Sequence, residues 1–110
     1  MSAASTARIR ELNDSFRRSF CGGRVNLTVG VASLPAVDMS TVLERVQTFG
    51  AFCAANDPYA EHDFGAIDYD GMRYFWKIDY YDQSLQGASP DPSDPHLTMR
   101  VLTVMRADEY

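Results

Sequence analysis

The sequence has no long apolar run and no apolar block among its first residues. Its apolar stretches are interrupted every few residues, so no segment approaches the roughly 20 residues needed to cross a bilayer. The opening segment, residues 1–8, is rich in serine and alanine and lacks the apolar core of a secretory signal. We therefore expect a cytoplasmic protein that has no contact with a membrane.

Cysteine and histidine are scarce, with two residues of each. Neither Cys21 nor Cys53 has a second cysteine at metal-ligand spacing, which excludes a zinc site built from thiolates. Both stand beside apolar residues near the end of a predicted helix, and we expect buried structural thiols rather than a disulfide. A phosphate-binding loop, a dinucleotide-binding glycine pattern and a nucleophile elbow are also missing. We expect no metal and no cofactor.

Basic residues are scarce in the second half of the sequence. From Asp57 onward there are four basic and eleven acidic residues, a net charge of -7, whereas the part before Asp57 carries six basic and four acidic residues. Nucleic-acid binding needs positive surface, so we exclude direct binding to nucleic acid. An acidic surface attracts basic proteins, including the nucleic-acid groove of another protein. Solubility alone is the other explanation of this charge.

The remaining composition is that of a globular protein. The 110 residues are 45% hydrophobic and 12% aromatic, which is enough for a packed core, and we expect a single domain over residues 1–110. Apolar residues at three- and four-residue spacing predict helices from Ser5 to Phe20 and from Asp38 or Ser40 to Ala54. Between the two helices, the alternation of apolar residues with small or polar residues predicts a strand over Val25–Val31.

A β-hairpin is the clearest local prediction. Asp70-Gly71, the preferred pair for a type I′ turn, stands between two alternating segments and places Asp68 opposite Arg73. Trp76 then lies on the face that the helices cover. The segment Thr98–Arg106 fits either a helix or a strand, and we prefer a strand because a hairpin needs a third partner. The prediction is an α+β fold, in the order α-β-α-β-β-β, with a small antiparallel sheet of about four strands and two helices packed on one face.

The most distinctive polar motif is Glu61-His62-Asp63, at the junction between a loop and the first strand of the hairpin. A histidine between carboxylates is suited to general acid–base chemistry, and Lys77 and Asp79 share one face of the following strand. The alternative is structural: these residues satisfy backbone groups where the chain enters the sheet, and Lys77 and Asp79 form an ordinary exposed ion pair. In extended backbone, Glu61 and Asp63 share one side and His62 faces the other.

Several segments resemble those of an uncharacterised bacterial family, the domain-of-unknown-function family numbered 3768. The segments that carry the resemblance are Arg8–Asp14, Glu61–Gly65, Phe75–Asp82, Ser89–Pro92 and Arg100–Met105. The resemblance implies a bacterial protein that is often carried on plasmids. It implies no activity, cofactor or catalytic residue, and the mobile-element setting favours a role against host defence or in plasmid maintenance.

Two functions of different classes follow from these observations. The first is a non-enzymatic protein that binds a basic protein surface and inhibits, by charge mimicry, a nucleic-acid-binding defence protein (as in anti-CRISPR or anti-restriction proteins) or a replication protein. The second is a small hydrolase or nuclease-like enzyme that uses His62 with Glu61, Asp63, Lys77 or Asp79. The acidic residues are dispersed along the sequence, whereas catalysis needs them to converge in a cleft, so we favour the first function. The expected partner-binding residues are Asp57, Glu61, Asp63, Asp68, Asp70, Asp82, Asp91 and Asp94.

Overall fold

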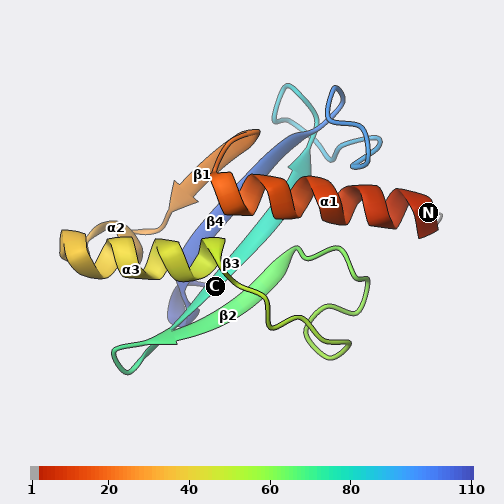
Figure 1. Cartoon of the computed structure of the whole chain (residues 1–110). Helices are drawn as coiled ribbons and strands as arrows, with labels where there is room; N and C mark the ends of the chain where they lie inside the picture. Colours follow the sequence, from red (N-terminus) through yellow and green to blue (C-terminus); the bar gives the residue numbers. More distant parts are fainter. Residues whose placement is uncertain (1–2) are drawn as a thin grey trace.

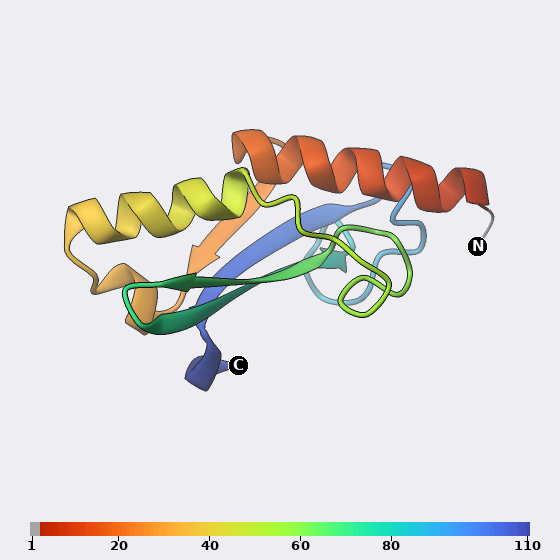
Figure 2. The same ribbon diagram turned by 60° about the horizontal axis from the view of Figure 1, so that its bottom comes forward.

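The computed structural model describes residues 3–110 and places two long helices on one face of a four-stranded sheet (Figures 1 and 2). The predicted α+β class and the order of its elements are confirmed. The elements are α1 (Ala3–Ser19), β1 (Gly23–Leu27), α2 (Val29–Ala32), α3 (Ala36–Gln47), β2 (Phe64–Tyr69), β3 (Met72–Tyr81), β4 (Met99–Arg106) and the 3-10 helix η1 (Ala107–Glu109).

The sheet is mixed rather than wholly antiparallel. Its strand order is β1-β4-β3-β2, in which β3 runs antiparallel to both of its neighbours and β1 runs parallel to β4. The sequence predicted antiparallel pairing throughout, and this is wrong for β1. No hairpin joins β1 to β4, so turn chemistry does not fix their relative direction, and a parallel pair is open to them through a long connection.

The β2–β3 hairpin has the predicted turn and register. Asp70 and Gly71 both have positive φ angles, 52° and 77°, as a type I′ turn requires. Tyr69 pairs with Met72 and Asp68 pairs with Arg73, whose guanidinium lies 2.9 Å from the Asp68 carboxylate. Met72 falls on the same face of β3 as Trp76 by alternation but is 37% exposed, because it lies at the tip of the hairpin.

The hydrophobic core lies between the helices and the sheet. Trp76 is fully buried there, together with Phe16 of α1, Val46 of α3 and Leu102 of β4. Gly65 pairs with Trp76 across the hairpin, and a Cβ atom at Gly65 would collide with the indole ring. The absence of a side chain at Gly65 therefore leaves room for Trp76, the only tryptophan in the sequence, to pack against β2.

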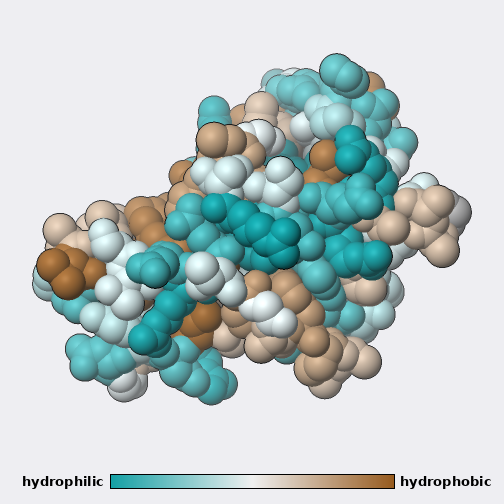
Figure 3. All heavy atoms as spheres, in the orientation of Figure 1, coloured by the Kyte–Doolittle hydropathy of each residue, from teal (hydrophilic) through white to brown (hydrophobic). Residues whose placement is uncertain are grey.

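Helix α1 lies across the sheet with a buried face that is partly polar. Ile9 and Phe16 are buried as the helical spacing predicts, but Asn13 and Arg17 on the same face are fully buried as well. On its outer side the helix contributes to a hydrophilic band across the molecule (Figure 3). None of the helices in residues 3–110 has both the length and the apolar character needed to span a membrane.

The predicted strand Val25–Val31 is too long, because the chain turns into α2 after Leu27. Just beyond β1, the Thr28 amide donates a backbone hydrogen bond to the carbonyl of Val104 on β4, at 3.1 Å. The next residues form a single helical turn, and the carboxylate of Glu109 accepts a hydrogen bond from the Gly30 amide at 2.8 Å. Alternation alone cannot reveal a partner that lies 79 residues later in the chain.

Helix α3 is shorter than predicted, and the thiols are not buried. The helix ends at Gln47 rather than at Ala54, and the buried Arg17 guanidinium donates to the carbonyl of Phe49 at 3.1 Å just beyond that end. Cys53 consequently lies in a loop, and both it and Cys21 are free and exposed. The prediction of buried structural thiols is wrong, because it assumed that both cysteines lie on packed helical turns.

Candidate functional site

The predicted histidine motif lies in the loop that leads from α3 to β2. Ala60 and His62 have left-handed backbones, with φ angles of 55° and 54°. The segment is therefore not extended, and the predicted alternation of side chains through Glu61, His62 and Asp63 does not apply. Left-handed geometry at residues other than glycine is sparsely populated and persists where surrounding contacts enforce it.

The imidazole of His62 is enclosed by two carboxylates and a phenyl ring. Its Nδ1 atom lies 2.8 Å from Oδ1 of Asp14 on α1, and its Nε2 atom lies 3.7 Å from Oδ2 of the buried Asp57. Its ring stacks on Phe52 at 3.7 Å, and its side chain is 23% exposed. We call these four residues, Asp14, Phe52, Asp57 and His62, the histidine cluster. Nδ1 is within hydrogen-bond distance of Asp14 and Nε2 lies near Asp57, so the imidazole connects two carboxylates of the protein.

Glu61 belongs to a second network that connects α1, β3 and β4. Its carboxylate accepts a hydrogen bond from the Tyr80 hydroxyl at 2.7 Å, and that hydroxyl accepts one from the Asn13 amide at 2.8 Å. The buried Arg100 donates to the Asn13 side-chain oxygen at 2.8 Å and lies against the Tyr80 ring. Burial, followed by the hydrogen bond to Glu61, raises the pKa of Tyr80, which keeps the phenol protonated. Buried polar groups that are mutually satisfied in this way fix the packing of α1 on the sheet.

Asp63 differs from its neighbours because no cation compensates it. Burial raises the pKa of its carboxyl group, and the nearby charge of Glu61 raises it further. Among residues 3–110 its side chain forms no ion pair. A carboxyl group with a raised pKa is a feature of many functional sites, but it also occurs in structural networks.

Lys77 and Asp79 lie on the opposite face of the sheet from the helices. Lys77 Nζ lies 2.9 Å from Oδ2 of Asp79, and the hydrogen bond to Asp79 raises the pKa of Lys77. The register places Lys77 opposite Phe64. The five candidate catalytic residues are therefore divided: Glu61, His62 and Asp63 lie around the loop before β2, whereas Lys77 and Asp79 line the outer face.

The acidic residues predicted to bind a partner have different surroundings. Asp57 is only 7% exposed, and Asp68 is exposed but paired with Arg73. Asp70 lies at the tip of the hairpin, at the other end of the ten-residue strand β3 from Asp82. The carboxylates of Asp82, Asp91 and Asp94 lie in the loop between β3 and β4 and accept local hydrogen bonds.

Four polar residues whose roles the sequence did not reveal organise these networks. Asp14 binds His62, Asn13 and Arg100 bind each other, and Glu109 holds the start of α2. One signal was available: Asn13 and Arg17 fall on the same helical stripe as Ile9 and Phe16, which marks them as buried. Within residues 3–110, no three His, Cys, Asp or Glu side chains are grouped so that they could hold a metal ion.

The fold and these contacts define a small α+β protein with a mixed four-stranded sheet and an internal polar network. The chain belongs to the family described as "Protein of unknown function (DUF3768)", whose model matches residues 27–109, and the predicted family membership is confirmed. The match begins at the last residue of β1, so α1 with Asp14 and Asn13 lies outside it. The chain matches no curated protein and no solved structure.

Proposed function

We propose that this protein is a non-enzymatic binding protein whose acidic C-terminal half contacts a basic protein surface. The contact that we propose is the loop between β3 and β4, residues 82–98, which we call the acidic loop. One observation carries this proposal: local hydrogen bonds fix the carboxylates of Asp82, Asp91 and Asp94 in place. The segment that bears them has no lysine or arginine that could neutralise their charge.

Local hydrogen bonds hold each carboxylate of the acidic loop without neutralising it. Asp82 accepts bonds from the Ser84 hydroxyl and the Gln86 amide, and the first of these bonds is the main reason that the pKa of Asp82 is lowered. Asp91 accepts bonds from the amide and hydroxyl of Ser93 at 3.1 and 2.6 Å. Charges that are fixed before binding lose less freedom when a partner arrives, which favours association.

The arrangement of the enzyme candidates supports the same choice. An acid–base mechanism needs its groups to converge on one substrate. Here Lys77 and Asp79 are separated by the sheet from His62, whose two ring nitrogens already face Asp14 and Asp57. A small hydrolase or nuclease-like enzyme that uses His62 with nearby carboxylates is the alternative function.

A nucleic-acid-binding protein is the partner class that we propose. Its groove presents positive charge to a row of phosphates, and a fixed row of carboxylates competes for the same charge. Such a partner suits an inhibitor of a defence protein, of the anti-CRISPR or anti-restriction type, or of a replication protein. A cytoplasmic location, which the sequence predicts, and a bacterial origin with carriage on a mobile element, which the family resemblance implies, are part of this proposal.

The test measures binding to a basic partner first captured from a bacterial host at low salt. The triple variant Asp82→Asn, Asp91→Asn, Asp94→Asn keeps a side-chain oxygen to accept each local hydrogen bond and removes only the charge. We expect its affinity for the partner to fall about tenfold or more and to depend less on salt, because exposed charges are screened over about 8 Å at physiological ionic strength. Added duplex DNA should displace the wild-type protein from the partner.

A matched control separates local charge from net charge. The comparison is with Asp91→Asn, Asp94→Asn, which removes two charges from the acidic loop. Glu11 and Glu44 are exposed acids on α1 and α3, so Glu11→Gln with Glu44→Gln removes two charges from the helical side instead. This control should keep most of the affinity. Binding that ignores salt and the triple variant but collapses in His62→Ala would overturn the proposal and favour the enzymatic alternative.

A further inference from the structure

Among residues 3–110, the face of the sheet that points away from the helices is covered only at its ends. At one end Tyr110 packs against Phe64 and Phe75, with ring centroids 6.2 and 5.7 Å apart. At the other end lies Leu85, in a left-handed conformation with a φ angle of 61°. Figure 2 shows that α1 and α3 both lie on the opposite side of the sheet.

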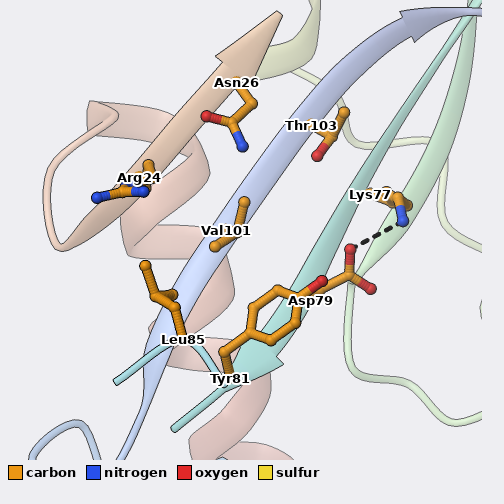
Figure 4. Close-up of a pocket in the computed structure, with 8 residues that line it drawn as sticks. All are labelled: Arg24, Asn26, Lys77, Asp79, Tyr81, Leu85, Val101 and Thr103. Atoms are coloured by element: carbon orange, nitrogen blue, oxygen red, sulfur yellow. Dashed lines mark ion pairs between the residues drawn. The ribbon is translucent and has the colours of Figure 1, made fainter. Parts of the chain in front are cut away.

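Between these ends a shallow groove follows β4. Its floor is formed by Val101 and Thr103, which are small side chains on a central strand. Larger residues of the neighbouring strands form its walls, with Arg24 on β1 and the Lys77–Asp79 pair on β3 (Figure 4). The groove has a volume of about 310 Å³, which is at the lower limit of small-molecule sites. We call it the outer-face groove.

The outer-face groove has positive charge and unused hydrogen-bond donors. Lys77 and Asp79 neutralise each other, which leaves Arg24 as the source of a net charge of +1 on a protein of net charge -5. Within residues 3–110 the guanidinium of Arg24 takes part in no ion pair and no hydrogen bond. The side chains of Asn26 and Thr103 face the same groove (Figure 4).

We propose that the outer-face groove binds a small organic monocarboxylate with an apolar body. An arginine fork pairs with a carboxylate through two parallel hydrogen bonds, and Arg24 is free to form them. Val101, which is 7% exposed, and Leu85 provide an apolar surface for the body of the ligand. With Lys77 and Asp79 paired, Arg24 balances only one negative charge, so the groove favours a monoanion over a dianion such as phosphate. The site takes Leu85 from the acidic loop but uses none of the three carboxylates of that loop.

The experiment is an NMR titration of the full-length protein at constant ionic strength. The probes are acetate, butyrate, hexanoate and inorganic phosphate. We expect amide shifts in β1, β3 and β4 around Arg24, Lys77 and Thr103. We also expect affinity to rise roughly two- to fourfold for each methylene that reaches the floor of the groove. Binding of phosphate that is tighter than that of hexanoate would overturn the monocarboxylate assignment.

Two variants and one control locate the site. Arg24→Gln should weaken hexanoate binding about tenfold or more, since a charge-assisted hydrogen bond is lost. Leu85→Ala should reduce the gain from acetate to hexanoate and leave acetate binding unchanged. The control is Arg18→Gln, which removes another exposed arginine, on α1, and should have no effect. Equal losses in Arg24→Gln and Arg18→Gln, or an affinity that does not depend on chain length, would show that only net charge attracts these anions.

Discussion

The Nδ1 atom of His62 lies 2.8 Å from Oδ1 of Asp14, a residue 48 positions earlier in the chain. This contact fastens α1 to the loop before β2. The same loop is held from α1 by Arg10, whose guanidinium donates to the carbonyl of Ala60 at 3.0 Å. The histidine thus connects two segments whose relative position no local interaction determines, and its first role is structural.

Replacing His62 by alanine should therefore lower stability. The buried Asp57 and the half-buried Asp14 would lose their shared partner, which should reduce the free energy of unfolding by about 1–3 kcal/mol. Chemical denaturation measures this change. The control is His96→Ala, because within residues 3–110 the His96 side chain is exposed and only the backbone of this residue forms hydrogen bonds. Equal midpoints for the two variants would contradict the structural role of His62.

The second prediction concerns the hairpin turn. Gly71 has a φ angle of 77°, and a β-branched residue at this angle is strained. Gly71→Val should reduce the free energy of unfolding by at least about 1 kcal/mol. Gly50→Val is the control, because Gly50 has no positive φ angle and a Cβ atom there would meet no atom within 4 Å. A loss as large in Gly50→Val as in Gly71→Val would exclude turn strain as the cause.

Local chemistry explains why the turn and the register of the hairpin could be predicted. The Asp70-Gly71 pair specifies a turn type, and the turn type specifies the register that brings Asp68 to Arg73. The buried stripe of α1 was also predictable, because helical spacing is a local property. What the sequence could not supply was the polar part of that stripe, since the partners of Asn13 lie at Tyr80 and Arg100.

The candidate site was predictable only as a list of residue types. The motif Glu61-His62-Asp63 was identified, but the left-handed backbone at His62 turns these side chains in directions that an extended segment does not allow. Lys77 and Asp79 were correctly placed together on one face of β3. Whether that face lies on the same side of the sheet as His62 depends on the whole fold, so the sequence could not predict it. The parallel pairing of β1 has the same origin, because β1 and β4 meet through a contact between distant segments.

The third prediction uses the raised pKa of Asp63. Burial raises this pKa, so the folded protein holds the proton to a higher pH than the unfolded chain does. The charged carboxylate is thus unfavourable to folding at neutral pH, and this cost disappears as pH falls through the folded pKa. Asp63→Asn should raise the unfolding midpoint at pH 7 and leave it nearly unchanged below about pH 4.

Asp68→Asn provides a control of opposite sign. The hydrogen bond from Arg73 lowers the pKa of Asp68, so its carboxylate favours folding above its ordinary pKa and loses this effect in acid. Asp68→Asn should lower the midpoint slightly at pH 7, because the pair is exposed. If both variants changed stability in the same direction at pH 7, burial would not be the dominant influence on Asp63.

The last prediction concerns Glu109, which joins the end of the chain to the start of α2. One of its carboxylate oxygens accepts hydrogen bonds from the Thr28 hydroxyl at 2.6 Å and the Arg106 amide at 2.8 Å, and the other accepts one from the Gly30 amide. The bond from Thr28 is the largest reason that the pKa of Glu109 is lowered. A lowered pKa means that the carboxylate stabilises the fold above the pKa of the unfolded chain and that this stability is lost as pH falls.

Glu109→Gln should accordingly loosen the start of α2 without unfolding the sheet. A glutamine amide has one acceptor oxygen in place of two, so it cannot serve both Thr28 and Gly30. Amide hydrogen exchange at Gly30 should become faster at pH 7, and the difference from the wild-type protein should shrink in acid, where the wild-type carboxyl group is protonated. Asp108→Asn is the control, because among residues 3–110 the Asp108 carboxylate pairs with the Arg106 guanidinium and forms no hydrogen bond to α2. Faster exchange in Asp108→Asn than in Glu109→Gln would show that the charge of the tail, and not the bridging carboxylate, holds α2 in place.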